Sequence, residues 1–152
     1  MWLVDASGAK APSILVREPA RDNGGPISPD ERWMAFTSDV SGRFELYAQA
    51  FPVPGRRVQI SEHGGVSSWW TRDGRQLVFL GDDFRGLWRV DLQPGTALGV
   101  GTPKQVATLP AGIVWVDAMP DRQRFLAIAP ERTGTGSITI VQNWRASLTG
   151  KQ

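Results

Sequence analysis

The stretch Trp70-Thr71-Arg72-Asp73-Gly74-Arg75-Gln76-Leu77-Val78-Phe79-Leu80 has the pattern of a strand, a tight turn and a second strand. Asp73-Gly74 suits the turn, because Gly adopts a positive φ at little cost and Asp can hydrogen-bond the backbone beyond it. In the second strand Leu77 and Phe79 fall on one face, since alternate residues of a strand point the same way. We therefore predict a β-hairpin here.

The same pattern occurs three times along the chain. The turn aspartates are separated by 43 and 48 residues, and each is followed four residues later by an apolar residue. The three pairs are Asp30 with Met34, Asp73 with Leu77, and Asp121 with Phe125. A period of about 40 to 50 residues with four short strands per unit is typical of β-propeller blades. An immunoglobulin-like sandwich also has many short strands, but it gives no reason to repeat one turn at this period.

The predicted fold is therefore all-β, a propeller segment of about three four-stranded antiparallel blades. Residues 19–25, rich in Pro, Gly and polar residues, are predicted as a surface loop. The predicted units are residues 1–18 as two outer strands of a partial blade, 26–61 and 66–109 as complete blades, 113–144 as an incomplete blade, and 145–152 as a tail.

Thirteen predicted strands make about three and a quarter blades, fewer than a closed propeller usually has. We therefore expect the ring to close only by oligomerisation or within a longer parent chain. One hypothesis is a head-to-tail homodimer, in which 26 predicted strands would exceed the roughly 24 of a six-bladed ring. An isolated fragment or an open arc is the alternative.

Composition limits the kinds of partner. Seventeen basic and fifteen acidic residues leave a net charge of only +2, which does not predict nucleic-acid binding. The chain has no Cys and one His, so we predict neither a disulfide, a metal site nor a cofactor. It contains no run of eighteen apolar residues and no signal-peptide pattern, so no membrane insertion is expected. Cytoplasm and periplasm both fit.

The three turns resemble the TolB-type propeller repeat, which is related to WD-type repeats and carries Ser-Pro-Asp-Gly-Arg before an apolar strand. Only the second copy keeps the Gly. The matching segments are Ile27-Ser28-Pro29-Asp30-Glu31-Arg32, Trp70-Thr71-Arg72-Asp73-Gly74-Arg75, Ala118-Met119-Pro120-Asp121-Arg122-Gln123, and the third-strand sequence Ser41-Gly42-Arg43-Phe44-Glu45-Leu46-Tyr47. The segment 138–144 is similar to the C-terminal ends of bacterial propellers fused behind serine/threonine kinase domains, a resemblance that implies a longer parent.

Candidate ligand contacts lie in the loops that gather at the other end of the strands, because propellers usually bind there. Trp69 is added because adjacent strand residues face opposite ways, so Trp69 and Trp70 cannot be buried in one layer. The candidates are Arg43, His63, Trp69, Asp82, Asp83, Arg85 and Arg132. The turn aspartates are interpreted as structural, since each can satisfy backbone donors.

No Gly-x-Ser-x-Gly, His-Glu-x-x-His or phosphate-loop sequence occurs, and no catalytic set of residues can be recognised. The sequence alone thus favours a non-enzymatic scaffold that binds a protein or peptide through these loops. Two alternatives stay open: an accessory or sensor domain of a larger enzyme such as a peptidase or kinase, and a binder of carbohydrates or small molecules.

Overall fold

The computed structural model describes residues 1–17, 19–130 and 139–140, and within these it consists of antiparallel β-strands joined by turns and loops. Three sheets form the blades, which we number in chain order. The first blade holds β3 (Asp22–Ile27), β4 (Trp33–Ser38), β5 (Glu45–Ala50) and β6 (Val58–Gln59). The second holds β7 (Ser67–Trp70), β8 (Gln76–Leu80), β9 (Gly86–Gln93), β10 (Gly99–Val100) and β11 (Lys104–Thr108), and the third holds β12 (Trp115–Ala118), β13 (Phe125–Ile128) and β14 (Thr139–Ile140).

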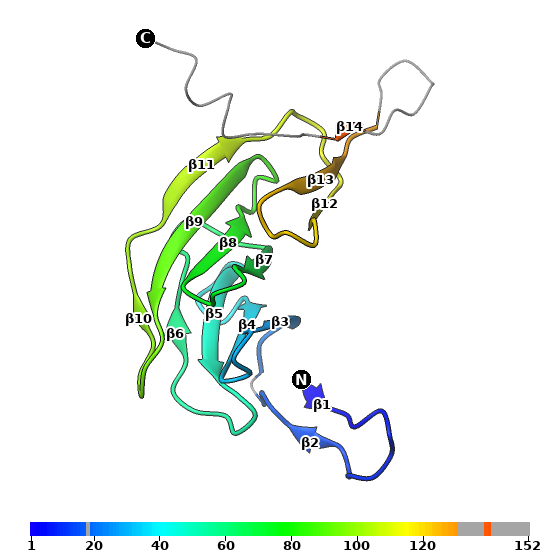
Figure 1. The fold of residues 1–152 in the computed structure, drawn as a ribbon, viewed down its shortest axis with the longest axis vertical. Helices are drawn as coiled ribbons and strands as arrows, with labels where there is room; N and C mark the ends of the chain where they lie inside the picture. The colour runs from blue at the N-terminus through cyan, green and yellow to red at the C-terminus, as the bar shows by residue number, and fades with distance from the viewer. Residues whose placement is uncertain (18, 131–138, 141–152) are drawn as a thin grey trace.

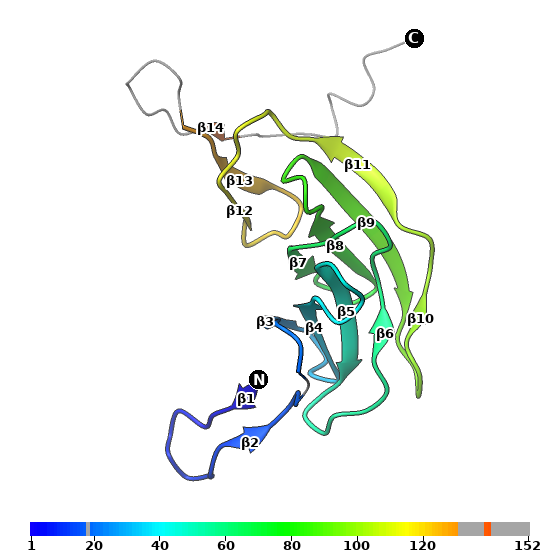
Figure 2. The same cartoon turned by 180° about the vertical axis from the view of Figure 1, so that it is seen from behind.

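The blades stand side by side in an arc (Figure 1). The first strands of the three blades, β3, β7 and β12, line its concave side, and β6, β10 and β11 lie on its convex side, as the reverse view also shows (Figure 2). A hairpin of β1 (Trp2–Leu3) and β2 (Ser13–Ile14) precedes the first blade. The fold is thus a partial propeller that does not close within the described residues, as the sequence predicts.

The repeated turns are built by their aspartates. In each turn the Oδ1 atom accepts the backbone N–H two residues on, at 3.2 Å for Asp30, 3.1 Å for Asp73 and 3.0 Å for Asp121. The residue after each aspartate adopts the left-handed conformation, with φ of 56° at Glu31, 67° at Gly74 and 58° at Arg122. The structural interpretation of these aspartates is confirmed, and two of the turns hold a left-handed residue that is not Gly.

The second blade has one strand more than predicted. Its β9 has eight residues and pairs with β10 near its end and with β11 along its first half. A single fourth strand at 104–109 was expected. The added strand arises because the chain turns back at residues 94–98 and first pairs with the end of β9.

The predicted loop at residues 19–25 is wrong from residue 22 onward, because β3 begins at Asp22. Gly24 and Gly25 both lie in this strand, which pairs with β4 through a register shift between Gly24 and Ile27. A Cβ atom at Gly25 would overlap the carbonyl oxygen of Ala35. Gly25 therefore allows close contact between strands, and the turn-like composition is misleading here.

The core consists of layers between blades. Trp70 faces the first blade and donates from Nε1 to the carbonyl oxygen of Pro26 at 3.0 Å, whereas Trp69 faces the third blade and donates to Asp117 Oδ1 at 2.8 Å. The layer between the first and second blades contains Trp33, Leu46, Ile60, Trp70, Leu77, Phe79 and Val90. The layer between the second and third contains Trp69, Val78, Leu80, Leu87, Val116 and Phe125. Each aliphatic or Phe side chain in these layers contributes about 1.5–3 kcal/mol on burial.

At each of the two blade boundaries, one arginine donates a hydrogen bond to the next blade. Arg32 of the first blade donates from Nη2 to the carbonyl oxygen of Gly95 at 2.9 Å, and Arg72 of the second blade donates to the carbonyl oxygen of Pro120 at 3.1 Å. Both bonds reach across a blade boundary at the same end of the strands. None of the described residues forms a helix that could cross a membrane.

Candidate functional site

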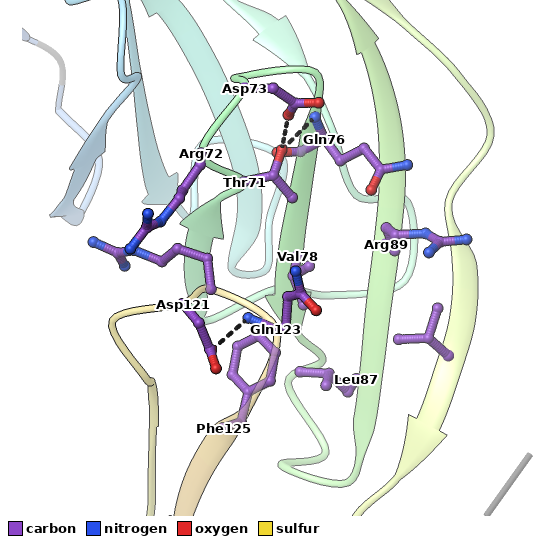
Figure 3. A pocket seen from close by; sticks show the side chains of 12 residues that line it. Thr71, Arg72, Asp73, Gln76, Val78, Leu87, Arg89, Asp121, Gln123 and Phe125 are labelled. Atoms are coloured by element: carbon purple, nitrogen blue, oxygen red, sulfur yellow. Dashed lines mark hydrogen bonds between the residues drawn. The ribbon is translucent and has the colours of Figure 1, made fainter. Parts of the chain in front are cut away.

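A cleft of about 320 Å³ opens between the second and third blades, at the end of the strands where the aspartate turns lie. Figure 3 shows it from close by, with the β7–β8 turn and the β12–β13 turn on its two sides. Its lining residues are Thr71, Arg72, Asp73, Gln76, Val78, Leu87, Arg89, Val106, Asp121, Arg122, Gln123 and Phe125.

The floor of the cleft is apolar and rigid. Val78, Leu87 and Phe125 belong to the layer between the blades, and each is buried. The Phe125 ring meets Trp69 edge to face, with ring centroids 5.2 Å apart, a favourable arrangement for aromatic pairs. Side chains on this floor are therefore fixed before any ligand arrives.

The two carboxylates of the cleft already accept hydrogen bonds within their own turns. Asp73 accepts the Thr71 hydroxyl at 2.6 Å and a backbone N–H, and these bonds hold the pKa of its carboxyl below the ordinary aspartate value. Backbone N–H donors, with the guanidinium of Arg124 at 2.7 Å, likewise lower the pKa of Asp121. Both carboxylates are charged at neutral pH, and both are engaged within their own turns.

The arginines of the cleft are engaged much less. Arg72 makes one hydrogen bond to a carbonyl oxygen, which leaves its charge unpaired. The side chains of Arg89 and Arg122 make no hydrogen bond or ion pair with any residue that the structure describes. In Figure 3 Arg72 and Arg89 lie on opposite sides of the cleft. Arg122 also occupies a left-handed position, which costs a residue with a side chain about 1 kcal/mol.

A further cation stands directly beside Arg89. The β9–β11 register pairs Arg89 with Lys104, and directly paired residues of neighbouring strands project from the same face. Lys104 is exposed and has no ion pair among residues 1–17, 19–130 and 139–140. The nearest acid along this face of β9, Asp91, accepts a hydrogen bond from Gln76 at 2.7 Å. Like charges in direct cross-strand pairs are destabilising, so this pair is unfavourable unless an anion binds there.

The candidate residues predicted from the sequence lie elsewhere. Arg43 donates from Nε to the buried Glu45 at 2.6 Å and from Nη2 to the carbonyl oxygen of Glu62. His63 is exposed in the same loop, and Asp82 lies against the backbone of Gly64, so the loops 61–65 and 81–85 come together.

Of the remaining predicted residues, Asp83 and Arg85 belong to the loop 81–85. Asp83 accepts the backbone N–H groups of Arg85 and Gly86 at 2.9 and 3.0 Å, and Arg85 is exposed. Trp69 is 7% exposed, and its ring packs against Phe125. Arg132 lies outside the described residues. A ligand role for these residues stays a prediction. The cleft itself was missed because Arg72 and Arg122 sit beside aspartates interpreted as structural, and because Arg89 meets Lys104 only through the pairing of β9 with β11.

Comparison with solved structures supports the propeller fold. The chain is similar to the crystal structure of an oligogalacturonate lyase from Vibrio parahaemolyticus, with a TM-score of 0.61, 16% identity, and coverage of 84% of this chain and 35% of the lyase. It is also similar to an oligogalacturonate lyase in complex with manganese, with a TM-score of 0.52, 18% identity, and coverage of 69% and 27%. Their fold is a seven-bladed β-propeller. The chain spans about a third of their length or less, and neither a family model nor a curated protein matches it.

These comparisons correct two predictions. The interpretation as a non-catalytic interaction scaffold, and with it the prediction that the chain is not an enzyme, is contradicted because the two solved proteins named above, which have a similar fold, are lyases. The identities establish the fold alone, and the comparisons do not extend to the TolB-like family or to a kinase fusion. In the part of the chain that the structure describes, no three His, Asp or Glu side chains come together as a group that could hold a metal ion.

Proposed function

We propose that this chain is part of a β-propeller that binds an anionic oligosaccharide, and that the cleft between the second and third blades holds the sugar carboxylates. Oligogalacturonate, which the names of the similar lyases contain, is such a compound and carries a carboxylate on each sugar unit. The observation that carries the proposal is the Arg89–Lys104 pair: Arg89 lines the cleft, Lys104 is its cross-strand partner, and neither side chain has an ion pair among the described residues.

The rest of the cleft supports the same class of ligand. An arginine binds a carboxylate through two parallel N–H groups, and such charge-assisted bonds are stronger than neutral ones. Arg72 and Arg89 on the two sides of the cleft could each meet one carboxylate of a short oligomer (Figure 3). The apolar floor of Val78, Leu87 and Phe125 offers a surface for a sugar ring between them. This combination of an apolar floor and a few polar groups is typical of ligand sites.

The TolB-like origin of the repeat is a further part of the proposal. It is supported by three turns that share an aspartate and a left-handed residue at equivalent positions. It has no bearing on which ligand binds in the cleft.

Isothermal titration calorimetry of the full chain with trigalacturonate tests the proposal. A neutral galactose trisaccharide of the same length is the control ligand. We expect binding of the acidic compound only, and weaker binding as salt is raised, because salt screens exposed charges. Replacing both cations, Arg89→Gln with Lys104→Gln, is expected to weaken binding about tenfold or more, since hydrogen bonds to charged groups contribute about 1.5–3 kcal/mol each.

The control variant is Lys10→Gln, which removes one exposed charge from the loop between β1 and β2. It should leave the affinity unchanged. Equal affinity for the acidic and neutral trisaccharides, or an unweakened double variant, would overturn the proposal.

A further inference from the structure

A second pocket, of about 290 Å³, lies on the other face of the second blade, against the loop that joins the first blade to the second. We propose that it binds a single neutral sugar ring. Its main lining residues are Glu62, His63, Phe79, Trp88, Thr102 and Pro103. This proposal does not depend on the anionic ligand of the first cleft, because the two pockets have no described lining residue in common.

The platform of the pocket is the indole of Trp88, which is half-buried. Phe79 is its cross-strand partner, and the two rings are nearly parallel at 13° with centroids 6.4 Å apart. A Cβ atom at Gly86 would lie 2.5 Å from Trp88 Nε1, so a glycine is needed there to seat the indole. The Nε1–H lies beside the backbone of Gly81 and Gly86 and makes no hydrogen bond with any described residue. An aromatic ring held rigidly with an open polar edge suits a sugar, which has an apolar face and a rim of hydroxyls.

The wall that carries His63 is also held in place. Glu45, which is 1% exposed, accepts the Gly64 N–H at 3.0 Å and the Ser61 hydroxyl, and it pairs with Arg43. Gly64 has a φ of 89°, and a Cβ atom there would overlap the Asp82 carboxylate. The loop is therefore held by buried hydrogen bonds although its tip is exposed. Ordering a flexible loop on binding costs free energy, so a loop that is already ordered makes ligand binding more favourable.

The charges of the pocket select against the ligand of the first cleft. Among the described residues, no Lys or Arg lines it, and Glu62 is the one acid that does. An anionic sugar would meet a carboxylate here without a counter-charge. The imidazole of His63 and the hydroxyl of Thr102 instead offer donors and acceptors to sugar hydroxyls. The volume lies at the lower end for ligand sites, which fits one ring.

Nuclear magnetic resonance of the 15N-labelled full chain tests the proposal, with methyl β-galactopyranoside and methyl β-glucopyranoside as probes. The Trp88→Phe spectrum assigns the Trp88 Nε1–H signal. We expect at least one glycoside to shift this signal and the Gly64 amide signal in a saturable way. Trigalacturonate should leave both signals in place.

Two variants complete the test. Trp88→Ala is expected to weaken glycoside binding about tenfold or more, a loss typical of a removed stacking partner. Because Trp88 also packs in the core, the exposed pair His63→Ala with Thr102→Val serves as a second variant and should weaken binding without altering the fold. Trp115→Phe, an exposed Trp on β12 outside this pocket, is the control. The proposal would be overturned if neither glycoside shifts the signals. It would also be overturned if tetramethylammonium shifts them instead, because the pocket would then hold a cation between Trp88 and Glu62.

Discussion

Replacing Lys104 with Gln should make the folded protein more stable. The side chain is exposed and stands opposite Arg89 across β9 and β11, so the substitution removes a repulsion and no hydrogen bond among the described residues. Two unit charges about 6 Å apart in water repel by about 0.7 kcal/mol. Cross-strand pairs contribute about 0.2–1 kcal/mol, and both side chains reach solvent. We therefore expect a gain of about 0.5 kcal/mol in the free energy of unfolding.

Urea unfolding followed by tryptophan fluorescence measures this gain, in chloride buffers free of phosphate and sulfate, which could bind to the pair. With a slope of about 2 kcal/mol per M, the midpoint should rise by about 0.25 M at 10 mM salt. At 1 M salt the screening length falls to about 3 Å, so the gain should disappear. Trigalacturonate should reverse the order, because a ligand that binds the folded wild type more tightly stabilises it more.

The reasoning about the pair would be refuted by a variant that is less stable than the wild type at low salt, or by a gain that persists at 1 M salt. Lys10→Gln, the same change in the loop between β1 and β2, should leave the midpoint within error.

Three further changes address the fold itself. Leu77→Ala leaves a cavity at a fully buried position between the first and second blades, and should lower the free energy of unfolding by about 2–5 kcal/mol. The control Val40→Ala changes an exposed side chain and should lower it by less than about 0.5 kcal/mol. Similar urea midpoints for the two variants would contradict the core assignment. Glu31→Gly relieves a left-handed residue and should stabilise by roughly 0.5 kcal/mol, so a lower melting temperature would show that the side chain matters more than the backbone. The folded-state pKa of Asp73 is lowered mainly by the Thr71 hydroxyl, so its contribution to stability is present above the ordinary value of 3.8 and is lost as pH falls through the folded pKa. Asp73→Asn should flatten the decline in urea midpoint between pH 5 and pH 3, and an unchanged decline would exclude this aspartate as a source.

The blade repeat could be predicted because its turn chemistry is local. Asp73-Gly74 and the apolar alternation after it depend on residues a few positions apart, and the other two turns follow the same rule. The strand at Asp22–Ile27 could not be found this way, since Gly25 is set by the carbonyl group of Ala35, ten residues further on. Composition indicates a loop there, and tertiary packing makes a strand of it.

The cleft could not be predicted from the sequence for a similar reason. Arg89 and Lys104 become neighbours only through the β9–β11 register, which shifts between Gln105 and Ala107 and follows the added strand β10. Arg122 gives a weaker local signal, because it stands where the second turn has Gly74. The sequence placed function at the opposite end of the strands, and the two loops predicted there do come together around Gly64.

The bonds from Arg32 to Gly95 and from Arg72 to Pro120 make the chain behave like a short stack in which every layer is held by its neighbours alone. The stability of such an array is a sum of layer terms and contact terms, and its ends open first. The second blade has a partner on both faces, so its amide hydrogens in β8 should exchange last, whereas those of the β1–β2 hairpin and of β12 should exchange early. Adding or removing a terminal blade would then shift this gradient along the stack without reversing it.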